Sequence, residues 1–435
     1  MKRVLIITYY WPPSGGSGVQ RWVKFAKYLP QEGWQPVVYT PENPELTTVD
    51  ESLEAEIPPS VEVLRTPIRE PYDLYRKIMG KKASGKEVTP ISSGKKGLKQ
   101  RIMLWIRANL FVPDPRISWV RPSVRFLKEY LKGHPVDLMI TTGPPQSMHL
   151  IGLKLHRETG LPWVADFRDP WSRHYSLPYL PLTQRSLRKI RRMEQEVLDE
   201  ASAVLTVTPF VQKEYAAQTR TPVAMITNGY DEEDFAADVT PDGYFNLTQT
   251  GYLAADGNPA VLWKVLGEMA GKDAAFREQL RIRLAGLVDK AVYDTLDREG
   301  LRPNLVDLGY CTHGTAIREQ QAASVLLLPL RNAPEMRNIL PGKVFEYMAA
   351  HRPVLGFGQP DGIQARLLKE TGAGVTCDWE DEAGIRTFVQ KAWEQHQAGG
   401  VSAPQGEVSQ YSRRNLTRQL AELLDKTTDS SLRSE

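Results

Sequence analysis

The sequence predicts an α/β protein of two domains, each built as a parallel sheet covered by helices, and three observations lead to this prediction. Short apolar runs that suit buried strands alternate with segments of helical periodicity. This alternation stops at residues 228–234, where an Asn-Gly pair and four acidic residues interrupt it, and then begins again. The length of 435 residues also exceeds what one hydrophobic core usually organises.

The first expected domain, residues 1–228, opens with a strand at residues 4–9, which is too short for a helix and is followed by Pro and Gly. Apolar residues with a helical period follow at residues 19–29, and QPVVYT forms the next strand. The pattern continues through the expected strands DLMITT, PWVADF, AVLTVT and VAMITNG, with a long helix at residues 182–201. Alternation on this scale indicates parallel strands joined by helices.

The second expected domain, residues 229–410, repeats the pattern. Its expected strands are FNLTQTG, RIRLAG, LVDLGY, SVLLLPL, RPVLGFG and AGVTCDW, and helices are expected through VLWKVLGEM, around Tyr293 and through Ile317. A last amphipathic helix at residues 411–425 is expected to pack back on the first domain, before a polar tail at residues 426–435.

Composition excludes several classes of protein. A hydrophobic fraction of 41% and a charged fraction of 25% are typical of a folded protein and argue against disordered and fibrous chains. The net charge of +3 gives no reason to expect a nucleic-acid partner. Cys311 and Cys377, the only cysteines, exclude a disulfide scaffold and suit free thiols in a cytoplasmic protein. No apolar stretch approaches the roughly 20 residues of a membrane-spanning helix, so any membrane contact is expected to be peripheral.

The segment 76–107 departs from this balance, with ten Lys or Arg residues against the single acid Glu87. Its second part, LKQRIMLWIRANLFV, carries apolar residues near helical spacing, including Trp105. A basic amphipathic helix with tryptophan can lie among anionic lipid headgroups on the inner face of a cytoplasmic membrane. The alternative is a helix packed on the sheet beside a solvated loop, and the sequence leaves both open.

Gly15, Gly16 and Gly18 form the first candidate site, in the loop TYYWPPSGGSGVQR between the first strand and helix. Such a loop can aim backbone N–H groups and a helix N-terminus at an anion. The third glycine of G-x-G-x-x-G is missing and no Gly-Lys-Ser/Thr follows, which disfavours nicotinamide, flavin and P-loop nucleotide binding. The structural alternative is a tight turn without a ligand.

A second candidate follows the strand SVLLLPL, where Pro341-Gly342 opens an expected helix that carries Lys343 and Glu346 on one face. Lys343 can meet phosphate and Glu346 can accept hydrogen bonds from ribose hydroxyls. The structural alternative is a surface ion pair. The location favours a ligand, because open α/β sheets bind ligands beyond the carboxyl ends of their strands.

A third candidate is the pair Arg168 and Asp169, directly after the strand PWVADF. Asp169 can orient or deprotonate an acceptor hydroxyl and Arg168 can contact a diphosphate, whereas the structural alternative is that Asp169 caps the next turn. The seven histidines show no paired spacing for a metal and G-x-S-x-G is absent, so no metal site is expected.

These motifs together resemble those of bacterial GT-B glycosyltransferases of the family 4 type, over most of residues 1–425. They are YYWPPSGGSGVQR, DFRDPW at 166–171, ITNGYDEEDF at 226–235, TGYL at 250–253 and PGKVFEYMAAHRPVLG. The resemblance implies two Rossmann-like domains facing across a cleft, with the donor nucleotide held mainly by the second and the acceptor by the first. It also implies transfer with retention at the anomeric carbon and no obligatory metal ion.

The resemblance assigns roles to single residues. Glu346 matches the second glutamate of the family's E-x7-E motif, which grips the donor ribose, while the first position is occupied by Asn338. The family's basic residue after the G-x-L strand is missing from TGYLAADGNP, and Lys343, rather than Lys264, is expected to replace it. The expected donor-binding set is Gly15, Gly16 and Gly18 of the first domain with Asn338, Gly342, Lys343 and Glu346 of the second.

The expected function is hexosyl transfer from a nucleoside diphosphate sugar to a hydroxyl of a glycan or polyprenyl-linked acceptor, in cell-surface polysaccharide synthesis. No cofactor is expected beyond the donor itself. Two alternatives remain open: a nucleotide-sugar epimerase of the same fold, and a non-catalytic scaffold that binds nucleotide sugars. Donor turnover without an acceptor would indicate the epimerase, and turnover only with an acceptor would exclude the scaffold.

Overall fold

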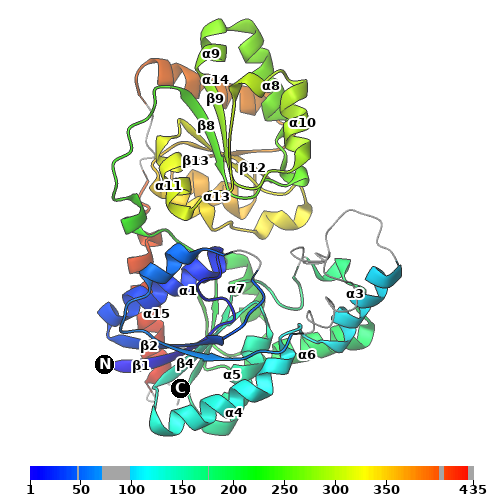
Figure 1. Ribbon diagram of the computed structural model, residues 1–435, viewed down its shortest axis with the longest axis vertical. Helices are drawn as coiled ribbons and strands as arrows, with labels where there is room; N and C mark the ends of the chain where they lie inside the picture. The colour runs from blue at the N-terminus through cyan, green and yellow to red at the C-terminus, as the bar shows by residue number, and fades with distance from the viewer. Residues whose placement is uncertain (47–48, 71–97, 175, 401–405, 430–435) are drawn as a thin grey trace. The chain divides into compact units, whose positions relative to one another are not determined.

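The computed structural model describes residues 1–46, 49–70, 98–174, 176–400 and 406–429. The chain divides into two compact units, each with its own parallel sheet (Figure 1). Unit 1 comprises Met1–Thr227 and Arg414–Glu435, and unit 2 comprises Asn228–Arg413. The two parallel sheets with interleaved helices confirm the predicted fold class.

Unit 1 contains a seven-stranded parallel sheet in the order β3-β2-β1-β4-β5-β6-β7. Its strands are β1 (Lys2–Ile7), β2 (Trp34–Pro41), β3 (Glu62–Thr66), β4 (Leu138–Gly143), β5 (Trp163–Phe167), β6 (Ala203–Thr206) and β7 (Val223–Met225). Its helices are α1 (Ser17–Tyr28), α3 (Leu98–Leu110), α4 (Ile117–Gly133), α5 (Ser147–Thr159), α6 (Gln184–Glu200), α7 (Pro209–Ala216) and α15 (Arg413–Thr428).

Two apolar cores stabilise unit 1, each centred on strand residues that point to one face of the sheet. Helix α15 contributes to the second of these cores, although it lies at the far end of the sequence. Leu416, Leu420 and Leu424 pack there with Val4 and Ile6 of β1. Figure 1 shows α15, in red, beside α1 and the first strands.

Unit 2 contains a six-stranded parallel sheet in the order β10-β9-β8-β11-β12-β13. Its strands are β8 (Phe245–Thr250), β9 (Leu280–Ala285), β10 (Leu305–Gly309), β11 (Val325–Pro329), β12 (Val354–Phe357) and β13 (Gly374–Cys377). Its helices are α8 (Ala260–Lys272), α9 (Ala274–Gln279), α10 (Lys290–Arg298), α11 (His313–Ala322), α12 (Lys343–Ala349), α13 (Ile363–Glu370) and α14 (Glu382–Gln397).

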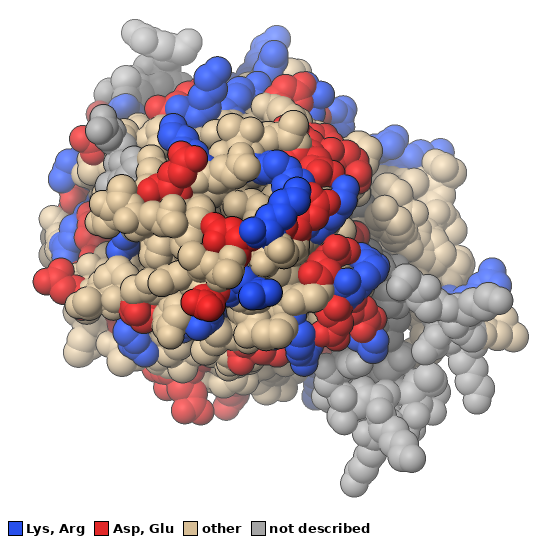
Figure 2. Space-filling view, turned by 90° about the horizontal axis from the view of Figure 1, so that it is seen from above, with Lys and Arg blue, Asp and Glu red and all other residues tan. Residues whose placement is uncertain are grey.

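Basic and acidic side chains are interspersed on the face of unit 2 shown in Figure 2. On α8 and α14, for example, Lys264 lies 2.7 Å from Glu382, and Arg386 lies 2.7 Å from Glu268. Such exposed pairs contribute little to stability but leave no large field of one sign. Among the described helices, none combines the length and apolar character needed to cross a membrane.

Candidate functional site

The clearest arrangement of functional groups in unit 2 lies where the carboxyl end of β8 meets the start of α12. Lys343 is the first residue of α12, and its Nζ donates a hydrogen bond of 2.6 Å to the carbonyl oxygen of Thr250, the last residue of β8. Burial lowers the pKa of Lys343 to about 8, although the nearby Glu346 carboxylate acts in the opposite direction. The ammonium is therefore held in a place where an anion would stabilise its charge.

Glu346 lies one turn further along α12 and is fixed by a neighbouring amide. The Gln320 side chain, from α11, donates hydrogen bonds to Glu346 Oε2 at 3.0 Å and to Thr250 Oγ1 at 3.2 Å. The hydroxyl of Tyr347 accepts the backbone N–H of Thr250 at 3.0 Å. Three elements distant in the sequence thus orient one carboxylate, half-buried at the end of the sheet.

Two glycines beside Lys343 bring the backbone after β8 close to the backbone after β9. Gly251 and Gly286 have φ values of +86° and +154°, which L-residues with a side chain rarely adopt. A Cβ atom on Gly286 would lie 2.1 Å from the Gly251 carbonyl oxygen, and one on Gly251 would lie 3.0 Å from Lys343 Nζ. Only glycines allow this close approach, which leaves backbone exposed next to the ammonium.

The other two residues that unit 2 contributes to the expected donor set precede α12 in the sequence. Gly342 is the residue before α12 and has an ordinary helical conformation, with φ −55°. Asn338 ends the short 3-10 helix at Pro334–Asn338 and is half-buried. The hydrogen bonds of the described residues join Lys343 and Glu346 to the end of β8, and they include none that ties Asn338 to this group.

In unit 1, the glycine loop leads directly into α1, as the sequence predicted. Gly16, with φ +108°, precedes the helix, and its carbonyl oxygen accepts the N–H groups of Val19 and Gln20. No described side chain caps this helix end. Gly15, Gly16 and Gly18 therefore surround a helix N-terminus, whose partial positive charge favours an anion.

Arg168 lies against this loop. A Cβ atom on Gly18 would be only 1.7 Å from one terminal nitrogen of the Arg168 guanidinium. The same guanidinium donates hydrogen bonds to the carbonyl oxygens of Gly143, at 3.2 Å, and Pro144, at 2.6 Å. The absence of a side chain at residue 18 thus determines where this cation can sit.

Asp169, the neighbour of Arg168, is half-buried beyond the end of β5. It is close enough to His174 for its negative charge to raise the pKa of that imidazole, although burial lowers the pKa by more. The two residues stand five positions apart in the segment after β5. The structure therefore places a histidine beside the proposed acid or base, which the sequence did not indicate.

A neutral histidine lies beneath Arg168. His149, on α5, is fully buried, and its ring stacks on Phe167 with centroids 4.3 Å apart. Burial and, to a smaller extent, the charge of Arg168 lower the pKa of His149 to about 3. Its Nδ1 atom lies 2.8 Å from the Thr141 hydroxyl, whereas Nε2 has no hydrogen-bond partner among the described residues. At neutral pH this imidazole therefore adds no second positive charge beside the guanidinium.

A buried ion pair between Arg21 and Asp166 joins α1 to the end of the sheet. Asp166 accepts hydrogen bonds from Arg21, at 3.4 Å, and from the Trp22 indole, at 3.0 Å. Arg21 also donates to the carbonyl oxygens of Ile226 and Thr227, the last residues of unit 1 before unit 2 begins. Because both charged groups are fully buried, removing either one would leave the other without compensation.

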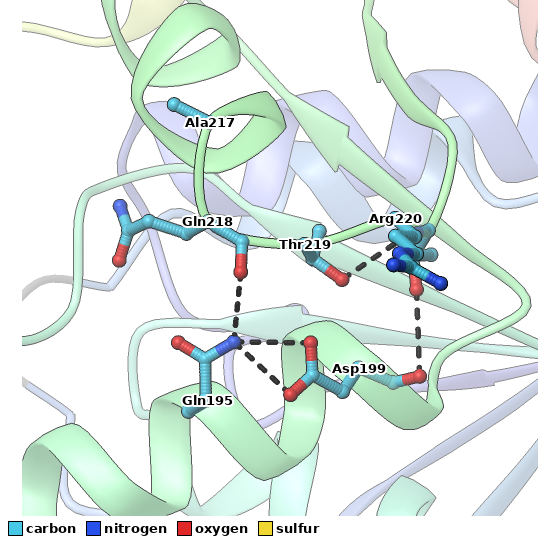
Figure 3. A pocket seen from close by; sticks show the side chains of 7 residues that line it. Gln195, Asp199, Ala217, Gln218, Thr219 and Arg220 are labelled. Atoms are coloured by element: carbon cyan, nitrogen blue, oxygen red, sulfur yellow. Dashed lines mark hydrogen bonds between the residues drawn. The ribbon is translucent and has the colours of Figure 1, made fainter.

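Another hollow of unit 1 lies on its surface, away from these groups. A cavity of about 540 Å³ lies between α6 and residues 217–221 (Figure 3). There the Gln195 amide donates to both carboxylate oxygens of Asp199 and to the carbonyl oxygen of Gln218. These hydrogen bonds join the polar groups of Gln195, Asp199 and Gln218 to one another. Among the described residues, no group of three or more His, Cys, Asp or Glu side chains is placed to hold a metal ion.

Comparison with solved structures identifies the fold. Sucrose-phosphate synthase of Thermosynechococcus elongatus is 12% identical over 98% of this chain and 99% of its own, with a TM-score of 0.61. HepE of Anabaena, solved in complex with UDP-glucose, is 15% identical over 98% and 100% of the two chains, with a TM-score of 0.60. WaaG, a glycosyltransferase involved in lipopolysaccharide biosynthesis, is 13% identical over 99% and 96%, with a TM-score of 0.51. The fold is that of the GT-B glycosyltransferases.

One family model matches the sequence of unit 1. Residues 15–229 match the family model described as a glycosyl transferase 4-like domain. No curated protein matches the sequence. The predicted resemblance to GT-B glycosyltransferases of the family 4 type is confirmed.

The sequence analysis proposed Lys343 and Glu346 as site residues but did not include the groups that position them. Gln320 gave no signal, because a single glutamine in a helix has no distinctive spacing. The ion pair of Arg21 with Asp166 joins residues 145 positions apart, so only the fold reveals it. Gly286 was visible as the end of RIRLAG, where a glycine after a strand can mark a close backbone approach.

Proposed function

We propose that this chain is a glycosyltransferase that moves a hexose or related sugar from a nucleoside diphosphate donor to a hydroxyl of a glycan or lipid-linked saccharide. The observation that carries this proposal is the pairing of Lys343 and Glu346 at the carboxyl end of β8. The family match in unit 1 and the likeness to HepE, which was solved with UDP-glucose, support it. The likeness to WaaG, a glycosyltransferase involved in lipopolysaccharide biosynthesis, supports a role in cell-surface polysaccharide synthesis.

Unit 2 binds the donor in this proposal. The Glu346 carboxylate, already oriented by Gln320, accepts hydrogen bonds from the ribose hydroxyls, and the Lys343 ammonium binds the diphosphate. The glycines after β8 and β9 let the diphosphate approach the backbone without meeting a side chain. Asn338 stands where relatives with the full E-x7-E motif carry a glutamate, and it supplies hydrogen bonds to the transferred sugar without a charge.

Unit 1 binds the acceptor and contributes to the chemical step. The bond between the anomeric carbon and the diphosphate oxygen breaks, and a bond to the acceptor oxygen forms on the same face of the sugar. The role proposed for Arg168 and the amides of Gly15, Gly16 and Gly18 is to stabilise the negative charge that develops on the leaving diphosphate. The acceptor hydroxyl gives its proton to the Asp169 carboxylate. The catalytic contribution is thus mostly electrostatic.

A ligand screen followed by turnover tests this function. One nucleoside diphosphate among those of uridine, guanosine, adenosine, cytidine and thymidine should raise the melting temperature, because a ligand at about 100 times its Kd stabilises a protein by about 2.7 kcal/mol. Sugars of that nucleotide are then supplied with and without glycan acceptors. Consumption only with an acceptor is the expected result. Stabilisation by no nucleotide, or turnover without an acceptor, would overturn the proposal.

A further inference from the structure

An exposed apolar strip runs along α3 in unit 1. Leu98, Ile102 and Trp105 are spaced by four and three residues, so they share one face of the helix, and they are 72%, 50% and 44% exposed. Leu110 at the end of the helix is 65% exposed. Large apolar side chains that gather in this way on a surface mark a site of interaction rather than scattered exposure.

A groove borders this strip. It has a volume of about 610 Å³ and lies between α3 and residues 178–181, which contribute Pro178, Tyr179, Leu180 and Pro181. Tyr179 is itself 49% exposed. The walls are therefore mostly apolar, with Arg101 as the charged residue among those that line the groove.

The basic first half of α6 follows the groove-lining residues 178–181 in the chain and is joined to α3 by hydrogen bonds. Asn109, near the end of α3, donates to the carbonyl oxygen of Pro181 at 2.9 Å and accepts hydrogen bonds from Thr183 and Ser186 at 2.8 Å. Figure 1 shows α3 beside α6. We call this continuous region, made of residues 98–110 and 177–193, the α3–α6 surface.

The charge of this surface has one sign. The sequence of residues 98–110 and 177–193 contains no Asp or Glu. Its exposed cations are Arg101, Arg185, Arg188, Lys189, Arg191 and Arg192. Of these, Arg192 pairs with Glu196, which lies just beyond the surface on α6. In unit 2, by contrast, exposed cations of α8 and α14 pair with carboxylates. A surface whose charges are all positive is therefore not a general feature of the molecule.

We propose that the α3–α6 surface binds an anionic lipid bilayer, with Ile102 and Trp105 inserted among the headgroups and an acyl chain in the groove. The cations complement anionic headgroups, and the apolar strip and groove complement the hydrocarbon beneath them. A soluble polyanion would satisfy the cations but would leave the apolar groove without a partner. This inference rests on the proposed function and deepens it, because binding to a bilayer would bring the enzyme to lipid-linked acceptors.

This placement differs from the sequence expectation, which assigned membrane contact to residues 76–107. Residues 76–97 lie outside the described residues, and the α3–α6 surface does not depend on them. Of the expected segment, only its last part, within α3, belongs to the surface. The basic residues of α6 are a contribution that the sequence analysis did not include.

Flotation of the full chain with vesicles tests the proposal. The protein should float with vesicles of phosphatidylglycerol and phosphatidylcholine at about 0.05 M salt and be released at about 1 M salt, where charges are screened beyond about 3 Å. A triple substitution Arg185→Gln, Arg188→Gln and Arg191→Gln should weaken partitioning on the order of 100-fold, because each cation near such a surface contributes about 1 kcal/mol.

Matched variants distinguish an effect of the α3–α6 surface from an effect of the protein's net charge. The triple substitution Arg121→Gln, Arg125→Gln and Lys154→Gln removes the same charge from exposed residues of α4 and α5 and should leave partitioning unchanged within about twofold. For the apolar strip, Trp105→Ser should lower partitioning at least tenfold, whereas Phe210→Ser, an exposed residue of α7, should not.

Each outcome decides the proposal. Absence of flotation at low salt, equal losses in the surface and control variants, or retention by nucleic acid with no retention by vesicles would overturn it. The nucleotide-induced rise in melting temperature is measured on the same samples. If that rise is present while flotation is absent, the membrane inference fails alone, and if flotation is present without the rise, only the proposed donor binding fails.

Discussion

At the scale of the residue, Lys343 shows how burial prepares a side chain for an anionic ligand. Its ammonium donates to the Thr250 carbonyl oxygen and lies near the Glu346 carboxylate, yet burial still lowers its pKa from 10.5 to about 8. A diphosphate beside it would restore the charged form, because an opposite charge raises the pKa of an ammonium. Donor binding and protonation of Lys343 are therefore linked.

This linkage predicts a pH dependence of donor binding. Above pH 8 the free protein holds Lys343 mostly neutral, so binding must take up a proton, and affinity for the nucleoside diphosphate should fall about tenfold per pH unit between about 8 and 10. Calorimetry at several pH values measures this slope. Lys343→Arg keeps the charge throughout and should show a flat profile. The same steep profile in Lys343→Arg and the wild type would assign the titration to another group.

The stability of the free protein should change in the opposite direction over the same range. The unfolded chain binds a proton at residue 343 up to about pH 10.5, whereas the folded chain has lost it above about 8. Because the unfolded state then binds more protons, the contribution of Lys343 to stability rises with pH in this window. Lys343 thus lowers stability at neutral pH, as a residue prepared for a ligand does.

The sequence predicted Lys343 and Glu346 because their spacing on a helix is local information. It could not predict Gln320 and Thr250, since these come from elements that only the folded sheet brings together.

Among the strands, the continuous apolar run of β11 could be recognised in the sequence, whereas β3 could not. β3 lies at the edge of its sheet and contains no fully buried residue. Its sequence, EVLRT, lacks the apolar pattern of a buried strand. The sequence analysis also did not predict α4, because Pro122 lies inside it and a proline in a helix interior normally argues against a helix.

At the scale of the element, α1 and its loop determine where Arg168 lies. Gly18 leaves room for the guanidinium, which the carbonyl oxygens of Gly143 and Pro144 then hold in place. Only the far end of a flexible side chain stands where a Cβ atom would go. A substitution at residue 18 therefore displaces the cation without disturbing the backbone.

Gly18→Ala should consequently impair transfer and preserve folding. Donor turnover in the presence of acceptor should fall as far as in Arg168→Ala, and the double variant should be no worse than either, because both changes act on the same guanidinium. The melting temperature should stay close to that of the wild type. Gly133→Ala, at a position of α4 with open space around it, is the matched control. Wild-type turnover in Gly18→Ala would contradict the role given to Arg168.

At the scale of the whole molecule, the chain forms two units with separate cores, and its last helix belongs to the first of them. Leu416, Leu420 and Leu424 of α15 pack with β1, the beginning of the chain. Residues that follow unit 2 in the sequence therefore stabilise unit 1. A cavity in the core of one unit is therefore expected to lower the free energy of unfolding of that unit alone.

Leu420→Ala tests this division. It should lower the free energy of unfolding of unit 1 by about 2–5 kcal/mol through the cavity it leaves, and should leave the unfolding of unit 2 unchanged. Urea unfolding followed by hydrogen exchange in each unit measures both. The exposed neighbour Glu422→Ala should change neither by more than about 0.5 kcal/mol. A loss confined to unit 2 would contradict the account.

The central claim is that unit 2 binds a nucleoside diphosphate sugar through Glu346, and calorimetric titration of the stabilising nucleoside diphosphate tests it most directly. Glu346→Ala should weaken binding on the order of 100-fold, because hydrogen bonds to a charged group contribute about 1.5–3 kcal/mol each. Glu370→Ala, an exposed carboxylate at the end of α13, should bind like the wild type. Unchanged affinity in Glu346→Ala would contradict the claim.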